Sequence, residues 1–444
     1  MSDFIERAKF SCALGGALTT IEGISRAIPI VHAAGGCAAA LSGTYNLAAG
    51  YRGIGYCGGN MIPTTNIAEN NVVFGGEERL AEQIENTLTA MDGDLYIVVS
   101  GCQVEIIGDD TVAVARRYRE RNVIGASTPG FSGNTYRGYD AVLESLIQNV
   151  IEKTDVKDKK TVNILGVVPG HDVFFKGNLD ELKRLLGLIG IKANTFFATG
   201  DSVADIRTYG GAALSIALSP LAGIRAAKAF EQTHDIPWIQ SEIPIGPGAT
   251  AEFLRTVGSA LEVDAALVEK VIARENEVYY SFLERVVDIY SDLDFQRFAI
   301  VAADSYYAHA LTRFLANDLG WVPFLTAIHD VEDEIGQIEY EARFADIDCP
   351  NKPTILFEHN ASKVLDAVRG AWPRNHNETY YSPLAPAYVV GSVIERGLAE
   401  KLGAGFLSVA FPVSNRVVLN KKVAGFAGAL SLVEDLLTNL VSSR

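Results

Sequence analysis

The chain has 444 residues, of which 48% are hydrophobic, and it carries a formal net charge of −16 at pH 7. This length allows two or three globular domains, and the acidity would repel a nucleic-acid backbone, which excludes that class of partner. Apolar runs end before the roughly 18 residues that cross a bilayer, and the first residues lack the order of a signal peptide. We therefore expect a cytoplasmic protein without a membrane segment.

Residues 1–155 predict one α/β domain, in which strands alternate with helices. The predicted strands are 27–31, 95–99 and 122–126, and the predicted helices are 77–91, 110–120 and 139–151. In the first of these helices, Leu80, Ile84 and Leu88 recur every four residues, which is typical of an amphipathic helix. Alternation of this kind predicts a parallel sheet with helices on both faces.

Two further units of the same class follow a charged stretch at residues 152–160, which we interpret as a solvated linker. The second unit, residues 156–292, contains predicted strands at 162–168, 195–198, 213–217 and 238–240, a helix at 179–188 and a long helical stretch at 262–290. The third unit, residues 293–444, contains predicted strands at 297–303, 322–326, 353–357 and 406–410 and helices at 306–319, 362–369 and 423–440. The fold prediction is therefore three Rossmann-like domains with parallel sheets.

The five cysteines are unevenly placed, at Cys12, Cys37, Cys57, Cys102 and Cys349. An odd number in a large chain without a secretion signal argues against a disulfide framework. For the third and the last of them, we expect the usual role of a small core residue.

Three of the cysteines lie in glycine-rich surroundings. Cys37 and Cys102 follow predicted buried strands, so we expect each on the loop just past a strand's carboxyl end, and Cys12 precedes a predicted helix. Open α/β sheets bind ligands at the carboxyl ends of their strands, and glycine lets the backbone approach a bulky anionic ligand.

Several kinds of chemistry use cysteine thiolates. Zinc sites and redox dithiols favour Cys-x-x-Cys pairs, which this sequence lacks, and a single catalytic thiolate would leave two cysteines unexplained. No glycine-rich fingerprint for ATP or NAD is present. Thiolates at scattered spacing suit an iron-sulfur cluster, but three ligands are one fewer than the usual four. A cluster completed by another subunit resolves this deficit.

Several segments resemble, in order, the N-terminal domain of the nitrogenase component 1 family. They are SCALGG at residues 11–16, VHAAGGC at 31–37, VVFGGE at 72–77, GCQVEIIGDD at 101–110 and TPGFSG at 128–133. FPVSNR at 411–416 and GFAGA at 425–429 resemble the closing segment of the β-type subunit.

The resemblance implies a ligand set, cofactors and partners. Cys12, Cys37 and Cys102 would bind half of a P-cluster-type [8Fe-7S] iron-sulfur cluster, which the chain would share with an α-type subunit in an α2β2 heterotetramer. A metal-sulfur catalytic cofactor would lie in that partner chain, so no catalytic residue is expected here. An ATP-dependent iron-sulfur reductase would dock near Phe74.

Six residues near the predicted ligands have expected supporting roles. Gly36 and Gly101 would permit close approach of the cluster. His32 would contact a cluster sulfur, or would alternatively be a buried histidine whose hydrogen bonds are satisfied within the chain. The carboxylates Glu105 and Asp110, together with Asp109, are expected to cap the helix that follows the third predicted ligand.

The sequence also departs from the nitrogenase pattern. Gly130 occupies the position at which molybdenum nitrogenase β subunits carry a serine that can bind the oxidised cluster. Residues 411–416 lack the histidine by which α subunits hold the catalytic cofactor. Cys349 with His359 would be a substitute site, but neither lies in a segment that resembles the family's cofactor-binding motifs. Compact length and the CALGG motif resemble nitrogenase-like reductases outside nitrogen fixation, of which methylthio-alkane reductase is an example.

The leading hypothesis is therefore the β-type subunit of a nitrogenase-like reductase that acts on methylthio-alkanes. A β subunit of a dinitrogen-reducing nitrogenase and a scaffold subunit for cofactor assembly are the alternatives within the family. A metal-free binding module, with every cysteine in the core, is the alternative outside it.

Overall fold

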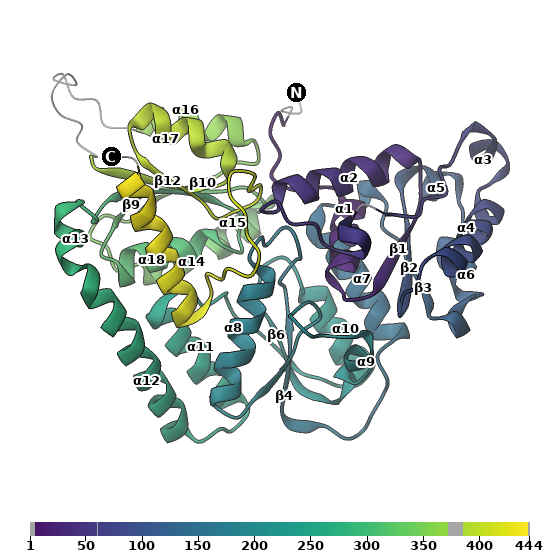
Figure 1. The fold of residues 1–444 in the computed structure, drawn as a ribbon, viewed down its shortest axis with the longest axis horizontal. Helices are drawn as coiled ribbons and strands as arrows, with labels where there is room; N and C mark the ends of the chain where they lie inside the picture. Colours follow the sequence, from purple (N-terminus) through teal and green to yellow (C-terminus); the bar gives the residue numbers. More distant parts are fainter. Residues whose placement is uncertain (1–4, 60, 372–384, 443–444) are drawn as a thin grey trace.

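Three parallel β-sheets follow one another along the chain (Figure 1) in a computed structural model that describes residues 5–59, 61–371 and 385–442. The strand orders are β1-β2-β3, then β5-β4-β6-β7, then β10-β9-β8-β11-β12. The strands are β1 (Ala27–His32), β2 (Leu95–Ser100), β3 (Val123–Ala126), β4 (Asp158–Leu165), β5 (Lys192–Asn194), β6 (Ala212–Ala217), β7 (Trp238–Gln240), β8 (Phe298–Ala303), β9 (Val322–Ile328), β10 (Thr354–Phe357), β11 (Ala387–Gly391) and β12 (Gly405–Ser408).

α-Helices connect these strands and pack against the sheets (Figure 1). They are α1 (Ala13–Gly23), α2 (Gly35–Ala48), α3 (Glu69–Phe74), α4 (Glu77–Ala90), α5 (Cys102–Ile107), α6 (Thr111–Arg116), α7 (Thr135–Asn149), α8 (Phe175–Leu188), α9 (Val203–Arg207), α10 (Ile224–His234), α11 (Gly246–Ala260), α12 (Ala265–Leu283), α13 (Val287–Asp292), α14 (Ala308–Arg313), α15 (Glu334–Glu341), α16 (Ala361–Ala371), α17 (Arg396–Leu402) and α18 (Gly425–Ser442). Among the residues described, none of these helices is long and apolar enough to cross a membrane.

The predicted α/β class with three parallel sheets is confirmed. The sheets span residues 27–126, 158–240 and 298–408, so that each predicted unit contains one sheet. The exact domain boundaries remain a prediction. One continuous hydrophobic core contains buried side chains from all three units, which fixes the units against one another.

Two helices of the first unit cross at very short range. A Cβ atom on Gly16 of α1 would lie 1.9 Å from the backbone oxygen of Thr135, at the start of α7. Only glycine permits so close an approach of two backbones. The crossing places the start of α1, and with it Cys12, beside the loop that leads into α7.

Some predicted bounds are wrong. The helix predicted at residues 110–120 is the much shorter α6, and the helix predicted at 306–319 is α14 followed by a π-helical turn at Phe314–Asp318. The strand predicted at 195–198 is a loop, in which the Ala198 backbone N–H and the Thr195 hydroxyl both donate to the buried carboxylate of Asp201, so this backbone donor does not join a sheet. β4 starts inside the predicted linker, and its first three residues are exposed, so their charges reach water.

Candidate functional site

The carboxyl ends of β1 and β2 lie side by side. His32 is in register with Ser100, and the backbone N–H of Gly101 donates to the backbone oxygen of His32 at 2.9 Å. Cys102 comes next as the first residue of α5, and Cys37 is the third residue of α2. Both predicted positions at a strand's carboxyl end are therefore correct, but the predicted loops are wrong, because each cysteine lies in the first turn of a helix.

The sulfur atoms of Cys12 and Cys102 lie close together. Cys12 is the N-cap residue of α1 and forms an isolated antiparallel bridge with Asn134. A Cβ atom on Gly130 would lie 3.0 Å from the Cys102 Sγ and 3.3 Å from the Cys12 Sγ, so one point is near both thiols. The fold thus brings together two cysteines that are 90 residues apart.

Cys37 lies on the face of α2 that turns toward the start of α1. Cys37, Leu41 and Tyr45 are spaced four residues apart and therefore share one face of the helix. The Tyr45 hydroxyl lies 2.9 Å from the Ser11 Oγ, and a Cβ atom on Gly15 would lie 2.9 Å from the Leu41 side chain. The third cysteine is thereby aimed toward the region of the other two.

All three cysteines are free and partly exposed, and open hollows lie at Cys12 and along α2. A hollow of about 440 Å³ is lined by Cys12, Gly130, Gly133, Asn134, Arg137 and Glu332, among others. A second, of about 330 Å³, runs along the small residues of α2, which include Gly35, Ala38, Ala39, Ser42 and Gly43. Cys12 therefore borders space that a cluster can fill, and the surface along α2 has room for a partner chain.

These residues fit an iron-sulfur cluster better than a single metal ion. Within the described ranges, no group of three His, Cys, Asp or Glu side chains is arranged to hold one ion. A cluster binds each thiolate through a different iron atom, so its ligands need not converge on one point.

The carboxylates after Cys102 have different roles. Asp110 caps α6, as predicted, by accepting from the Ala113 N–H at 2.9 Å. The prediction for Glu105 is wrong, because its carboxylate accepts from the hydroxyls of Ser100 and Ser127. These bonds tie the end of β2 to the segment after β3, which is the segment that leads to the glycine between the two thiols.

His32 is fully buried and has a partner at each ring nitrogen. Its Nδ1 lies 3.1 Å from the Thr65 Oγ1, and its Nε2 lies 3.1 Å from the Asp109 Oδ2. Burial lowers the pKa of His32, although the bond to Asp109 opposes this effect. These bonds agree with the alternative of a satisfied buried histidine. Asp109 also accepts from the Gly76 N–H at 3.0 Å, so it caps α4 and not the helix predicted.

The two predicted glycines differ in their surroundings. A Cβ atom on Gly36 would meet nothing within 4 Å, which leaves that side of α2 open. A Cβ atom on Gly101 would lie 2.6 Å from the Ala33 side chain, so this glycine is required by packing within the chain. Packing against Ala33 therefore explains a glycine at position 101 without any approach of a cluster.

An exposed apolar patch surrounds Phe74. The Phe74 side chain is 86% exposed, and Val73 beside it is 72% exposed. Ile106 of α5, a helix that contacts α3, is 74% exposed. Of these three residues, the sequence predicts only Phe74 as a contact, since an exposed valine or isoleucine cannot be told from a core residue by its type. Apolar side chains that gather on a surface in this way mark interaction sites.

The remaining cysteines differ from each other. Cys57 is exposed and has a backbone φ of +50°, so the prediction of a core residue is wrong. Cys349 is partly buried against the main core, in agreement with that prediction. The Nδ1 of His359 lies 2.8 Å from the backbone oxygen of His329. This bond gives His359 a structural role.

Comparison with known proteins gives the same family. The model of the nitrogenase component 1 type oxidoreductase family matches residues 12–441. The nitrogenase molybdenum-iron protein beta chain of Methanococcus maripaludis is 26% identical, over 98% of this chain and 94% of its own length. The B subunit of light-independent protochlorophyllide reductase from Leptolyngbya boryana is 24% identical, over 85% of this chain and 73% of its own length.

The fold comparison agrees with these matches. The solved structure of nitrogenase Cp1 at pH 6.5 superposes with a TM-score of 0.80 at 19% identity, over 100% of this chain and 94% of that chain. The three-sheet architecture is therefore that of a nitrogenase protein. On the strength of the family match, this chain belongs to the nitrogenase component 1 type oxidoreductases, as a nitrogenase-like β-type subunit.

Proposed function

We propose that this chain relays electrons through half of a P-cluster-type [8Fe-7S] cluster held by Cys12, Cys37 and Cys102. An α-type partner supplies the other half, in an α2β2 assembly in the cytoplasm. The observation that carries this proposal is the shared position of two thiols around Gly130, with the third aimed toward them by α2. When bound, the cluster accepts and passes on electrons.

The chain's own residues hold and shape this half-site. Three thiolates bind the cluster, and the missing side chain at Gly130 leaves the space between two of them open. The buried strands β1 and β2, and the Glu105 carboxylate that accepts from Ser100 at the end of β2 and from Ser127 after β3, keep the surrounding backbone fixed. A rigid ligand frame limits the change in structure when an electron arrives or leaves, which favours rapid transfer.

The reductase docking site is proposed at the patch of Phe74, Val73 and Ile106. Hydrogen bonds connect this patch to the proposed cluster site. The Asp109 carboxylate bonds to the N–H of Gly76, two residues after Phe74, and to the ring of His32 at the end of β1. An ATP-dependent iron-sulfur reductase bound here would deliver its electron next to the thiols. From the cluster, electrons would continue to a metal-sulfur cofactor in the α-type partner, where substrate is reduced.

Replacement of one ligand tests the proposal. Cys37→Ala in the purified complex should lower the iron content and abolish electron transfer driven by reductase and ATP. Cys57→Ala is the matched control, because this thiol is exposed and lies in the same domain. Unchanged iron content and electron transfer in Cys37→Ala would refute the ligand assignment.

For the substrate, we propose methylthio-alkanes. The support is the CALGG motif at residues 12–16 together with Gly130, where molybdenum nitrogenase β subunits carry serine. The complex should reduce methionine-derived thioethers, and dinitrogen more slowly or not at all. Efficient dinitrogen reduction would favour the nitrogenase alternative, and iron uptake without turnover of any reducible substrate would favour the scaffold.

A further inference from the structure

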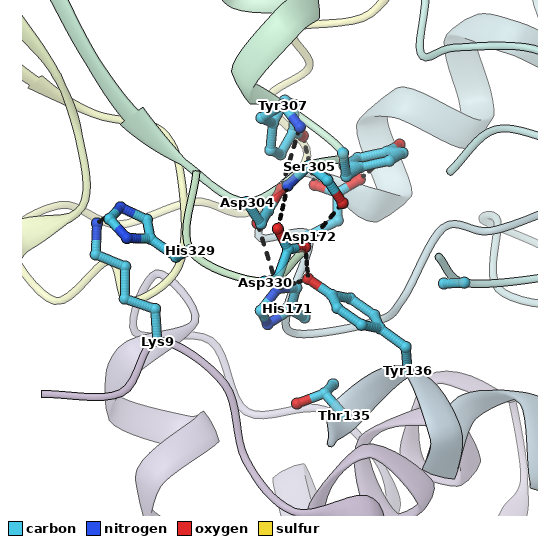
Figure 2. A network of polar contacts seen from close by, with 12 residues as sticks. Lys9, Thr135, Tyr136, His171, Asp172, Asp304, Ser305, Tyr307, His329 and Asp330 are labelled. Carbon is cyan, nitrogen blue, oxygen red and sulfur yellow. Dashed lines mark hydrogen bonds and ion pairs between the residues drawn. The ribbon is translucent and has the colours of Figure 1, made fainter. Parts of the chain in front are cut away.

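A buried polar network joins side chains of all three units (Figure 2). Its side chains come from the start of α7 and from the segments after β4, β8 and β9. They are Tyr136, His171, Asp172, Asp304, Ser305, Tyr306, Tyr307 and Asp330. Carboxyl ends of parallel strands are the usual place for a ligand, and here the chain fills that place with its own side chains.

Tyr136 connects the first unit to this network. Its hydroxyl donates to the Asp330 Oδ2 at 2.7 Å and lies 3.0 Å from the His171 Nε2 (Figure 2). Asp330 also accepts from the backbone N–H and the hydroxyl of Ser305, at 2.7 and 2.8 Å. Tyr136 is 5% exposed, so the loss of one of these bonds cannot be replaced by bulk water.

The two residues before Tyr136 hold the start of α1. The Thr135 Oγ1 accepts from the Ser11 N–H at 2.9 Å and lies 3.1 Å from the Ser11 Oγ. Asn134 forms the antiparallel bridge with Cys12. Three consecutive residues therefore contact, in turn, the proposed ligand, the residue before it, and the buried polar network.

Lys9, three residues before Cys12, makes a second connection. Its Nζ donates to the Glu395 Oε2 at 2.8 Å, to the His329 Nε2 at 2.9 Å and to the Ala302 backbone oxygen at 3.3 Å. Ala302 belongs to β8 and Glu395 comes after β11, the two neighbouring strands at which the order of the third sheet reverses. The lysine is 3% exposed and uses all three ammonium protons.

We propose that Tyr136 and Lys9 are positioning residues for the Cys12 thiolate. They fasten the backbone at this ligand and just before it to the third unit, so that the arrangement of the domains sets the geometry of the cluster. This inference rests on the proposed function, because it takes Cys12 to be a ligand. It adds that the potential of the cluster depends on side chains outside the first unit.

The structure offers a matched pair of substitutions as a test. Tyr136→Phe and Tyr307→Phe each remove one buried hydroxyl that donates to a buried carboxylate at 2.7 Å. Only Tyr136 adjoins the residues that hold Cys12. In the purified complex, both variants should melt at lower temperature by a similar amount. Only Tyr136→Phe should shift the midpoint potential and the electron paramagnetic resonance (EPR) signal of the cluster.

A measurement without metal separates this inference from the proposed function. In the full-length chain freed of iron, iodoacetamide should alkylate Cys12 several-fold faster in Tyr136→Phe than in Tyr307→Phe, with Cys102 as the internal reference. Equal alkylation, or an equal potential in the two complexes, would overturn the positioning role. An iron-free wild-type complex would instead refute the proposed function, whatever the alkylation rates.

Lys9→Met provides an independent variant if Tyr136→Phe does not fold. Its control is Lys183→Met, which removes a 2.7 Å ion pair with Asp201 in the second unit. Lys9→Met should speed the alkylation of Cys12 and shift the cluster potential, and Lys9→Arg should restore part of both. The same potential and alkylation rate in Lys9→Met and the wild type would contradict the proposal.

Discussion

Substitution of Gly130 by alanine tests the half-site at its narrowest point. The added Cβ atom would lie 3.0 Å from the Cys102 Sγ and 3.3 Å from the Cys12 Sγ, whereas ordinary contacts begin at 3.4 Å. The Cys102 sulfur must therefore retreat by about 0.4 Å, which uses most of the roughly 0.5 Å within which binding geometries tolerate error. Gly130 does not have a left-handed backbone, so alanine itself adds no backbone strain.

We expect the apparent affinity of the complex for the cluster to fall by about tenfold, as when residues that support metal ligands are changed. Iron and sulfide per αβ pair, and the EPR signal of the cluster, measure this loss. Gly187→Ala is the control, because a Cβ atom there meets nothing within 4 Å and the residue lies on α8 in the second unit. Full iron content and an unchanged signal in Gly130→Ala would show that the two sulfurs do not bind metal across this gap.

Three further outcomes depend on single side chains. Phe74→Ala should raise the KM for the reductase without loss of iron. Phe282→Ala, at a distant exposed phenylalanine, should leave this KM unchanged, and equal KM values in the two variants would place docking elsewhere. Burial raises the pKa of Glu22 to about 8, so the stability that its protonated form provides is lost as the pH rises toward 8. Glu22→Gln should therefore stabilise the chain by an amount that grows by about 1.4 kcal/mol per pH unit from about pH 5 to 8, and a gain independent of pH in urea titrations would contradict this. Burial lowers the pKa of His309, but bonds to two carboxylates raise it to about 9, so the charged form stabilises the fold below that pH. In thermal melts, His309→Gln should therefore destabilise the chain at pH 7 and much less at about pH 10.

Local sequence patterns predicted the strands that position the site. Buried strands read as apolar runs that end in glycine, and this pattern located β1 and β2 and hence the approximate places of Cys37 and Cys102. The same rule failed for the segments directly after these strands. Gly35 and Gly36 suggested a loop, yet they begin α2, because glycine is acceptable at a helix start when the packing of later residues favours the helix.

Contacts between distant segments could not be predicted. Tyr136 and Asp330 are 194 residues apart, and no local periodicity connects a tyrosine with an aspartate at that separation. Glu105 has the type and position of a helix cap, so the sequence predicts that role. Its carboxylate instead accepts from two serine hydroxyls at neighbouring strand ends, which no local pattern reveals. The role of Gly130 as the space between two sulfurs also depends on tertiary contacts alone.

Location of iron in a crystal of the complete complex tests the central claim most directly. Anomalous diffraction at the iron absorption edge should place iron atoms within bonding distance of the sulfurs of Cys12, Cys37 and Cys102, at the boundary with the α-type partner. Iron found elsewhere, with these three sulfurs bound to no metal, would contradict the account.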